Sequence, residues 1–272
     1  MTLRPNTVEE TLFIALWCRA YVSKHYPSLL CDAKAVDLVR AIDYDFSVIE
    51  SRFSPEYFLT SAARARQCDD AATAYVAAHP RASVINLGAG LDTTFYRIDN
   101  GSIEWYDLDL PSVIALRKQL LPETDRTHAI AKSLLDTSWY DELRHTKHGV
   151  FAIAGGVLAY LEEWQVQAFF SALADHLPGS EMVFTAYSPY EVSQVNRSLR
   201  RLGMTHAAMK WALEDAHDLT RWDDRISVLE QYSFFRGISL DQAWGEETVS
   251  RIREIDEQKL MSVVHLSVLG SR

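Results

Sequence analysis

The sequence predicts an α/β fold built on a mostly parallel sheet. Three observations predict it. An apolar run at residues 82–87 ends at a glycine turn, Gly88-Ala89-Gly90. A second run, residues 103–106, leads into the acids Asp107 and Asp109. The last run, residues 260–269, alternates partly between apolar and polar side chains, which predicts a terminal antiparallel strand.

The first 80 residues are expected to be mostly helical. Apolar side chains recur at helical spacing within residues 11–26 and 32–43. Pro55 suits the first turn of another helix, and the alanine-rich stretch 69–78 ends before Pro80. Because this helical segment precedes the first strand, we expect it to pack over the ligand site as a lid.

The rest of the chain continues as alternating helices and strands in one domain. We assign residues 81–190 and 255–272 to the core sheet, residues 1–80 to the lid and residues 191–254 to an inserted cap. The expected elements are a helix from near Asp92, helices at 112–121, 162–177 and 190–210, and strands at 128–132, 149–154 and 181–187.

The glycine turn and Asp109 have the spacing of a nucleoside site. Glycine lets a ligand approach the main chain closely, and an acid about 20 positions later can accept hydrogen bonds from ribose hydroxyls. Position 93, where a dinucleotide fingerprint has its third glycine, holds Thr93, and Asp92 precedes it. An acid here disfavours a diphosphate and fits S-adenosyl-L-methionine (SAM), which has a ribose and a sulfonium but no phosphate. A turn that needs glycine for its geometry alone is the alternative.

The stretch VINLGAGLDTTFYRI, followed by YDLDLPSVIALRKQLL, resembles the leucine carboxyl methyltransferase family, including its bacterial branch of tetracenomycin-type O-methyltransferases. Further matches lie in the same order at residues 63–70, 133–139 and 154–161. The resemblance implies a class I methyltransferase-like Rossmann sheet, SAM as the cofactor and oxygen as the methylated atom.

The resemblance also implies which residues contact SAM. Arg64 matches an arginine that pairs with the SAM carboxylate, although spacing alone would make Arg64 and Arg66 a solvated surface pair. Ser133 stands where many relatives have an aspartate beside the adenine, and Gly155 stands where some have a glutamate. The expected cofactor-binding residues are Arg64, Gly88, Ala89, Gly90, Asp92, Asp109, Leu110, Ser133, Leu134 and Gly155.

The segment 204–236 is the candidate for choosing the methyl acceptor. It is rich in aromatic side chains, which either wall a small-molecule pocket or pack a subdomain onto the core. A carboxylate acceptor, with a pKa of about 4, needs no base, whereas a phenol, with a pKa of about 10, does. His206 and His217 are base candidates only, so the catalytic residues are unknown and a carboxylate acceptor is favoured.

Composition excludes several classes of partner. The net charge of −10, from 27 basic and 37 acidic residues, opposes nucleic-acid binding. No window is long enough for a membrane span, and Glu9 and Glu10 precede the first apolar run, unlike a signal peptide. No metal site is expected, because His145 and His148 have no third ligand. Cys18, Cys31 and Cys68 show no C-x-x-C spacing and are expected to be buried thiols of a cytoplasmic protein.

The predicted function is a SAM-dependent O-methyltransferase that acts on a small metabolite, such as a polyketide-type secondary metabolite. One alternative is a protein that binds SAM or another nucleoside without transfer activity, as the departures at Ser133 and Gly155 suggest. The other is an NAD-dependent oxidoreductase, which the missing third glycine opposes. The acceptor and the oligomeric state stay open.

Overall fold

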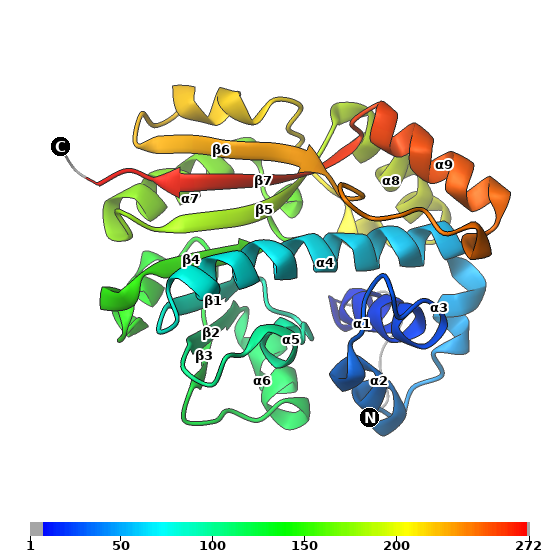
Figure 1. Ribbon diagram of the computed structural model, residues 1–272, viewed down its shortest axis with the longest axis horizontal. Helices are drawn as coiled ribbons and strands as arrows, with labels where there is room; N and C mark the ends of the chain where they lie inside the picture. Colours follow the sequence, from blue (N-terminus) through cyan, green and yellow to red (C-terminus); the bar gives the residue numbers. More distant parts are fainter. Residues whose placement is uncertain (1–7, 271–272) are drawn as a thin grey trace.

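A seven-stranded sheet runs through the middle of the computed structural model, which describes residues 8–270 (Figure 1). The strand order is β3-β2-β1-β4-β5-β7-β6. Neighbours from β3 to β5 are parallel, whereas β7 is antiparallel to both β5 and β6. The predicted α/β class, with an antiparallel C-terminal strand, is confirmed. The strands are β1 (Ser83–Leu87), β2 (Glu104–Asp109), β3 (Thr127–Ala131), β4 (Val150–Ala154), β5 (Glu181–Tyr187), β6 (Ile226–Ser233) and β7 (Met261–Val268).

Helices cover both faces of this sheet. Successive strand residues point to opposite faces, so Val84 packs into one hydrophobic cluster and Ile85 into the other. The long helix α4 (Pro55–Ala78) crosses the first face, in front of the sheet in Figure 1. Helix α7 (Glu163–His176) packs on the second face through its buried apolar side chains.

The N-terminal helices α1 (Val8–His25), α2 (Ala33–Ala41) and α3 (Ser47–Arg52) are grouped at the lower right of Figure 1. Helix α1 contacts both α2 and α4. The chain has one continuous helix over 55–78 where the sequence suggested two, because no glycine or proline interrupts it after Pro55. Residues 1–7, which belong to the start where no signal peptide is expected, lie outside the described residues.

The helix expected at 190–210 is shorter than predicted. Helix α8 ends at Arg201, and Gly203, with φ +74°, turns the chain into a short 3₁₀ turn at Thr205–Ala207. Left-handed backbone of this kind ends helices and favours glycine. The remaining helices are α5 (Thr94–Ile98), α6 (Pro111–Leu120), α8 (Pro189–Arg201) and α9 (Glu246–Glu257), the last of which the sequence did not predict.

Strand β6 lies inside the 191–254 segment that we assigned to a cap. It pairs with β7 and carries half-exposed side chains along most of its length. The segment therefore supplies an edge strand of the sheet as well as residues near the ligand site. A polar, half-exposed strand lacks the apolar run by which the other strands are recognised.

Two further expectations concern the membrane and the cysteines. None of the helices within residues 8–270 is both long and apolar enough to cross a bilayer. Cys18 and Cys68 are buried, as expected, but Cys31 is exposed, so the prediction of a buried thiol was wrong for that residue. Cys31 lies in the connection between α1 and α2 rather than on an apolar helix face.

Candidate functional site

A cavity of about 470 Å³ opens at the carboxyl ends of β1, β2 and β4. Helices α1 and α4 and the turn after α8 complete its walls. This is the edge where parallel α/β sheets bind ligands. Its lining includes Leu12, Ala15, Arg19, Tyr57, Arg64, Cys68, Gly88, Gly90, Asp92, Asp109, Leu110, Gly155, Gly156, Val157, Tyr160, Met204, His206 and Lys210.

Asp109 holds the glycine turn in place from the tip of β2. Its carboxylate accepts hydrogen bonds from the backbone N–H of Gly90 at 2.8 Å and of Leu110 at 2.7 Å. Burial raises the pKa of Asp109, and these two hydrogen bonds oppose that rise. Each oxygen keeps a further lone pair for a ligand hydroxyl.

Gly88 is required by close packing at this turn. Its φ of +67° is left-handed, and an added Cβ would lie 2.6 Å from the Cβ of Val157, in the loop after β4. The loops after β1 and β4 therefore touch, and the first can present its main chain to the cavity.

Arg117, on α6, holds the glycine turn through hydrogen bonds to its main chain. Its guanidinium donates to the carbonyl oxygens of Gly90 at 3.0 Å and Asp92 at 2.7 Å. It also pairs with the buried Asp107 at 2.7 Å. The shape of the turn is thus set by a buried charge pair as well as by glycine.

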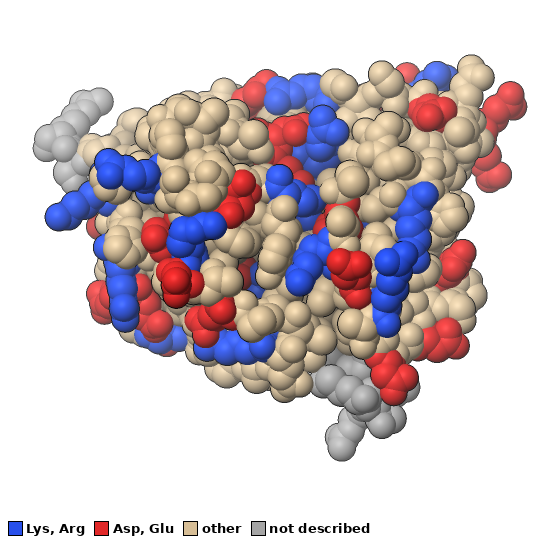
Figure 2. All heavy atoms as spheres, turned by 60° about the horizontal axis from the view of Figure 1, so that its bottom comes forward, with Lys and Arg blue, Asp and Glu red and all other residues tan. Residues whose placement is uncertain are grey.

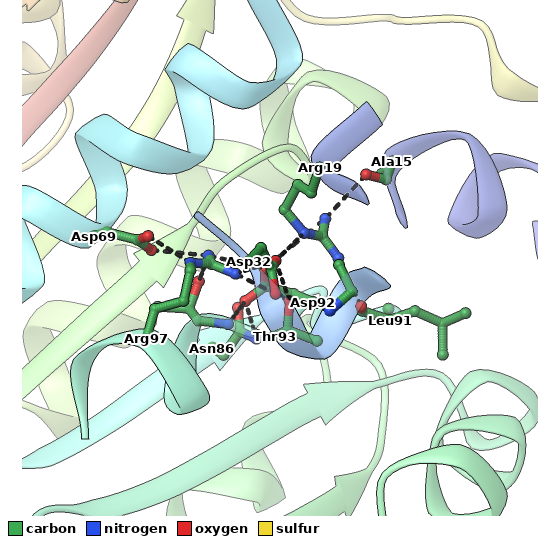
Figure 3. Close-up of polar contacts among 12 residues, drawn as sticks. Ala15, Arg19, Asp32, Asp69, Asn86, Leu91, Asp92, Thr93 and Arg97 are labelled. Atoms are coloured by element: carbon green, nitrogen blue, oxygen red, sulfur yellow. Dashed lines mark hydrogen bonds and ion pairs between the residues drawn. The ribbon is translucent and has the colours of Figure 1, made fainter. Parts of the chain in front are cut away.

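A buried charge network joins the N-terminal helices to the glycine turn (Figure 3). Asp32, which caps α2, accepts from Arg19 of α1 at 3.1 Å and from Thr93 and Arg97. Arg97 also pairs with Asp69 of α4 at 2.6 Å. The network therefore links α1, α2, α4 and α5 around one fully buried carboxylate.

Asp92 lies where this network meets the cavity. Burial alone would raise its pKa, but Arg19 and Arg97, at 3.9 and 3.7 Å, hold the pKa well below its usual range. Its carboxylate also accepts from the backbone N–H of Thr94 at 3.1 Å. Asp92 is therefore a fixed negative charge beside the glycine turn.

Arg64 reaches the cavity from α4. It donates a hydrogen bond to the Tyr187 hydroxyl at 3.3 Å, and within residues 8–270 no carboxylate pairs with it. Gly156 makes room for it, because an added Cβ there would lie 2.8 Å from its Nη1. Arg66, two positions later, instead pairs with Asp70 at 2.8 Å on the surface. The guanidinium of Arg64 is therefore available to an anion in the cavity.

Eight of the ten positions expected to contact the cofactor line the cavity, and two do not. Arg64, Gly88, Ala89, Gly90, Asp92, Asp109, Leu110 and Gly155 line it. Ser133 accepts from the backbone N–H of Leu135 at 3.2 Å in a local turn, and Leu134 packs against a hydrophobic cluster. The structure does not bring Ser133 and Leu134 to the cavity lining.

The aromatic side chains of the 204–236 segment are mostly core residues. Trp211 and Trp222 pack on the α7 face of the sheet, and Phe234 and Phe235 on the α4 face. The cavity is lined instead by residues 204–210 of this segment. Of the two base candidates, His206 lines the cavity, whereas His217 is exposed and bonds to Asp215 at 2.9 Å.

Sequence reasoning missed several polar groups of the cavity. Tyr57 and Tyr160 line it, and so do Arg19 and Cys68. Burial raises the pKa of Tyr160, and it raises that of Cys68 to about 12, so both groups are neutral near pH 7. Tyr160 lay within the quoted match at 154–161, but Arg19 and Tyr57 had no signal beyond helical spacing.

Charged side chains of both signs are interspersed over the face shown in Figure 2. Blue and red groups alternate there and do not form one continuous basic track.

Comparisons with known proteins agree with this geometry. Residues 11–174 match the model of the leucine carboxyl methyltransferase family. The chain is 33% identical over 233 residues to the tetracenomycin polyketide synthesis O-methyltransferase TcmP of Streptomyces glaucescens, with 85% of each chain covered. It is 27% identical over 253 residues to the S-adenosyl-L-methionine-dependent methyltransferase dpfgK of Gibberella zeae, covering 83% of this chain and 84% of that one.

Solved structures share the fold at low identity. A DUF574-family protein from Streptomyces avermitilis superposes with a TM-score of 0.59 at 14% identity, over 93% of this chain and 97% of the other. A candidate methyltransferase from Thermobifida fusca gives a TM-score of 0.55 at 16% identity, over 93% and 94%.

Proposed function

The chain belongs to the leucine carboxyl methyltransferase family, and from that premise we propose that it transfers a methyl group from SAM to a carboxylate or hydroxyl oxygen of a small molecule. A polyketide-type acceptor is favoured by the relative from S. glaucescens. The free thiols support a cytoplasmic location as part of the same proposal.

The observation that carries the proposal is the position of Arg64. A guanidinium that faces a cavity, with a tyrosine hydroxyl at 3.3 Å and no carboxylate partner within residues 8–270, favours an anionic ligand. The carboxylate of SAM supplies such an anion, and a planar guanidinium can bind it through two parallel hydrogen bonds. Gly156 keeps the space beside Arg64 open.

The other end of SAM fits the glycine turn and Asp109. The carboxylate of Asp109 would accept hydrogen bonds from the ribose hydroxyls with the lone pairs left by Gly90 and Leu110. Asp92 would favour the positively charged part of SAM. It also opposes a nicotinamide dinucleotide, because a diphosphate would lie beside an ionised carboxylate.

SAM supplies an activated methyl group with a neutral leaving group, so the protein must align the acceptor oxygen and exclude water. Near the cavity, Tyr160 and Cys68, whose pKa values are raised further above neutrality, stay protonated, and Arg19 and Arg97 keep Asp92 a weak base. This set of groups favours an acceptor that is already ionised, such as a carboxylate. For a hydroxyl acceptor, His206 is the side chain of this cavity suited to take up the proton.

Titration calorimetry with SAM, S-adenosylhomocysteine and NAD tests the cofactor. We expect saturable binding of the first two ligands and none of NAD. Transfer of a labelled methyl group to naphthoic acid and to naphthol then separates carboxylate from hydroxyl acceptors. NAD binding tighter than SAM binding would favour an oxidoreductase, and SAM binding without transfer to any of a broad panel of acids and phenols would favour a binding protein.

A further inference from the structure

We propose that Asn196 is a positioning residue for the methyl acceptor, because its amide fixes the turn at residues 202–210 as the acceptor-side wall of the cavity. The inference rests on the proposed function. It goes further by naming the residue that shapes the acceptor pocket without lining it.

Asn196 lies on α8 and bonds to the outgoing end of the turn. Its amide N–H donates to the carbonyl oxygen of Met209 at 2.8 Å, and its amide oxygen accepts from the N–H of Met209 at 2.8 Å. The pair of bonds mimics the exchange between two strands. One side chain thus fixes both backbone groups of Met209.

The chain beyond the turn is tied to the loop after β4. The N–H groups of Lys210 and Trp211 both donate to the carbonyl oxygen of Ala159, at 2.7 and 3.1 Å. Lys210 also pairs with Glu162 at 3.0 Å. Asn196 therefore joins α8 to a segment that is anchored at the tip of the strand where the cavity opens.

The turn between these anchors is held mainly by its own short-range bonds. The N–H of Ala207 donates to Met204 at 3.1 Å, and that of Ala208 to Thr205 at 3.3 Å. The incoming end of the turn is tied to α8 by main-chain bonds, from the N–H of Gly203 to the carbonyl oxygen of Arg200 at 3.1 Å and from that of Met204 to Leu199 at 2.8 Å. The two bonds of Asn196 tie the outgoing end, at Met209, to the same helix.

The turn carries the cavity-lining residues that lie farthest in sequence from the glycine turn. Met204, His206, Ala207, Ala208 and Lys210 line the cavity. On the facing side α1 contacts this turn, and Leu12 of α1 also approaches Gly90 closely. Movement of the turn would change the acceptor end of the cavity and leave the Gly88–Asp109 end in place.

The predicted acceptor surface is apolar with aromatic and imidazole groups, since Tyr57, Tyr160 and Met204 face the same cavity as His206. Hydroxynaphthoic acid, with its carboxyl and hydroxyl groups on adjacent carbons, is a suitable probe, because an aromatic ring buries a large area against such walls. It offers both kinds of oxygen at once.

The experiment compares the native protein with Asn196→Leu, which keeps the approximate shape of the side chain and removes both hydrogen bonds. Each protein is loaded with S-adenosylhomocysteine, and the dissociation constant of the probe is measured by calorimetry. Hydrogen–deuterium exchange at residues 203–210 is followed with and without the probe. We expect about a tenfold weaker probe affinity in the variant, the size of effect that removing backbone hydrogen bonds of ordinary net strength produces. The affinity for S-adenosylhomocysteine should change less than twofold.

Gln231 offers a matched control. Its amide also holds a loop, by accepting from Ala216 at 2.9 Å and donating to Glu214 at 3.0 Å, but none of these residues lines the cavity. Gln231→Met should lower thermal stability without changing either affinity. Asn196→Asp keeps an acceptor for the Met209 N–H but sets a carboxylate oxygen against the Met209 carbonyl oxygen, so it should lose at least as much probe affinity as Asn196→Leu, and it serves if Asn196→Leu does not fold.

Protection of residues 203–210 by the probe in the native protein, and its loss in Asn196→Leu, would support the proposal. An unchanged probe affinity in the folded Asn196 variants would overturn it, and so would a probe that leaves these amides unprotected in the native protein. Failure of S-adenosylhomocysteine to bind the native protein would instead overturn the proposed function.

Discussion

Replacing Arg64 with methionine should separate ligand binding from folding. Arg64→Met keeps much of the apolar stem and removes the guanidinium. In the folded protein that group has one hydrogen bond, to Tyr187 at 3.3 Å, and no carboxylate partner within residues 8–270. Its removal should therefore leave the melting temperature of the ligand-free protein unchanged or slightly higher, because an ionised group that is poorly paired is costly to bury.

The effect on SAM binding should be large. A hydrogen bond between charged groups contributes about 1.5–3 kcal/mol, and the guanidinium can make two of them to one carboxylate. Water that enters the vacated space will offset part of the loss, so we take the lower sum, about 3 kcal/mol. That corresponds to roughly a 150-fold increase in the dissociation constant.

Two further variants make the test specific. Arg64→Lys keeps the charge but not the planar fork, so we expect about a tenfold loss of affinity. Arg66→Met removes a guanidinium from the same helix that is paired with Asp70 on the surface, where such pairs contribute at most about 1 kcal/mol to stability. Its SAM affinity should stay within twofold of the native value.

Calorimetry of SAM and S-adenosylhomocysteine binding, with thermal unfolding in parallel, measures all three variants. A folded Arg64→Met protein that binds SAM within twofold of the native affinity would refute the assignment of Arg64 to the SAM carboxylate. A drop in melting temperature as large as that of a core substitution would refute the claim that Arg64 serves binding rather than folding.

Three other predictions address the glycine turn. SAM affinity should weaken as the pH falls from neutrality toward the pKa of Asp109, which burial raises, because a protonated carboxyl accepts fewer hydrogen bonds. Calorimetry across pH should show this dependence in the native protein and not in Asp109→Asn. Because the same raised pKa makes the folded state the better proton acceptor, stability without ligand should move the opposite way and fall slightly as the pH rises through that window. Arg117→Met should cost about 3–5 kcal/mol in the free energy of urea unfolding, because it leaves a buried carboxylate without its guanidinium. Gly88→Ala should lower both the stability of the protein and its SAM affinity, because the added methyl group would clash with Val157. Gly101→Ala is the control: it has a similar positive φ but open space, so it should cost only about 1–2 kcal/mol of backbone strain and leave SAM affinity unchanged.

The parts of the site that the sequence predicts best are those fixed by short stretches of chain. The glycine turn and Asp109 follow from a strand that must turn at once into the next element, and both lie at the cavity. Arg64 needed a resemblance as well, because a helical arginine has no pattern that separates it from Arg66, which pairs with Asp70. The space that the Arg64 guanidinium occupies depends on Gly156, which is far away in sequence.

The parts that the sequence did not predict depend on tertiary context. Asp32 has the local pattern of an N-cap, which it is, but its partners Arg19, Thr93 and Arg97 lie on other elements. Strand β6 has no apolar alternation, because it is an edge strand with half-exposed side chains. Ser133 was expected at the cavity from the family resemblance, yet its hydroxyl closes a local turn instead.

The acceptor segment shows why aromatic content alone does not identify a pocket. Trp211 and Phe234 are large enough to wall a binding site, but both are buried against the sheet. The lining comes instead from a turn of smaller residues around His206. Volume and hydrophobicity serve a core and a pocket equally well, so sequence reasoning could not choose between them.

The buried carboxylate of Asp32 has a consequence for the order in which the protein is made. Its partners Thr93 and Arg97 follow it by 61 and 65 residues, so at about 5–20 residues per second a ribosome delivers them roughly 3–13 s later. During that interval the emerging helices α1 and α2 have Arg19 as a partner for this charge but lack Thr93 and Arg97, which follow the glycine turn. The first helices to leave the exit tunnel therefore cannot complete their docking until the nascent chain has extended past the cofactor turn, and the two regions mature as one unit.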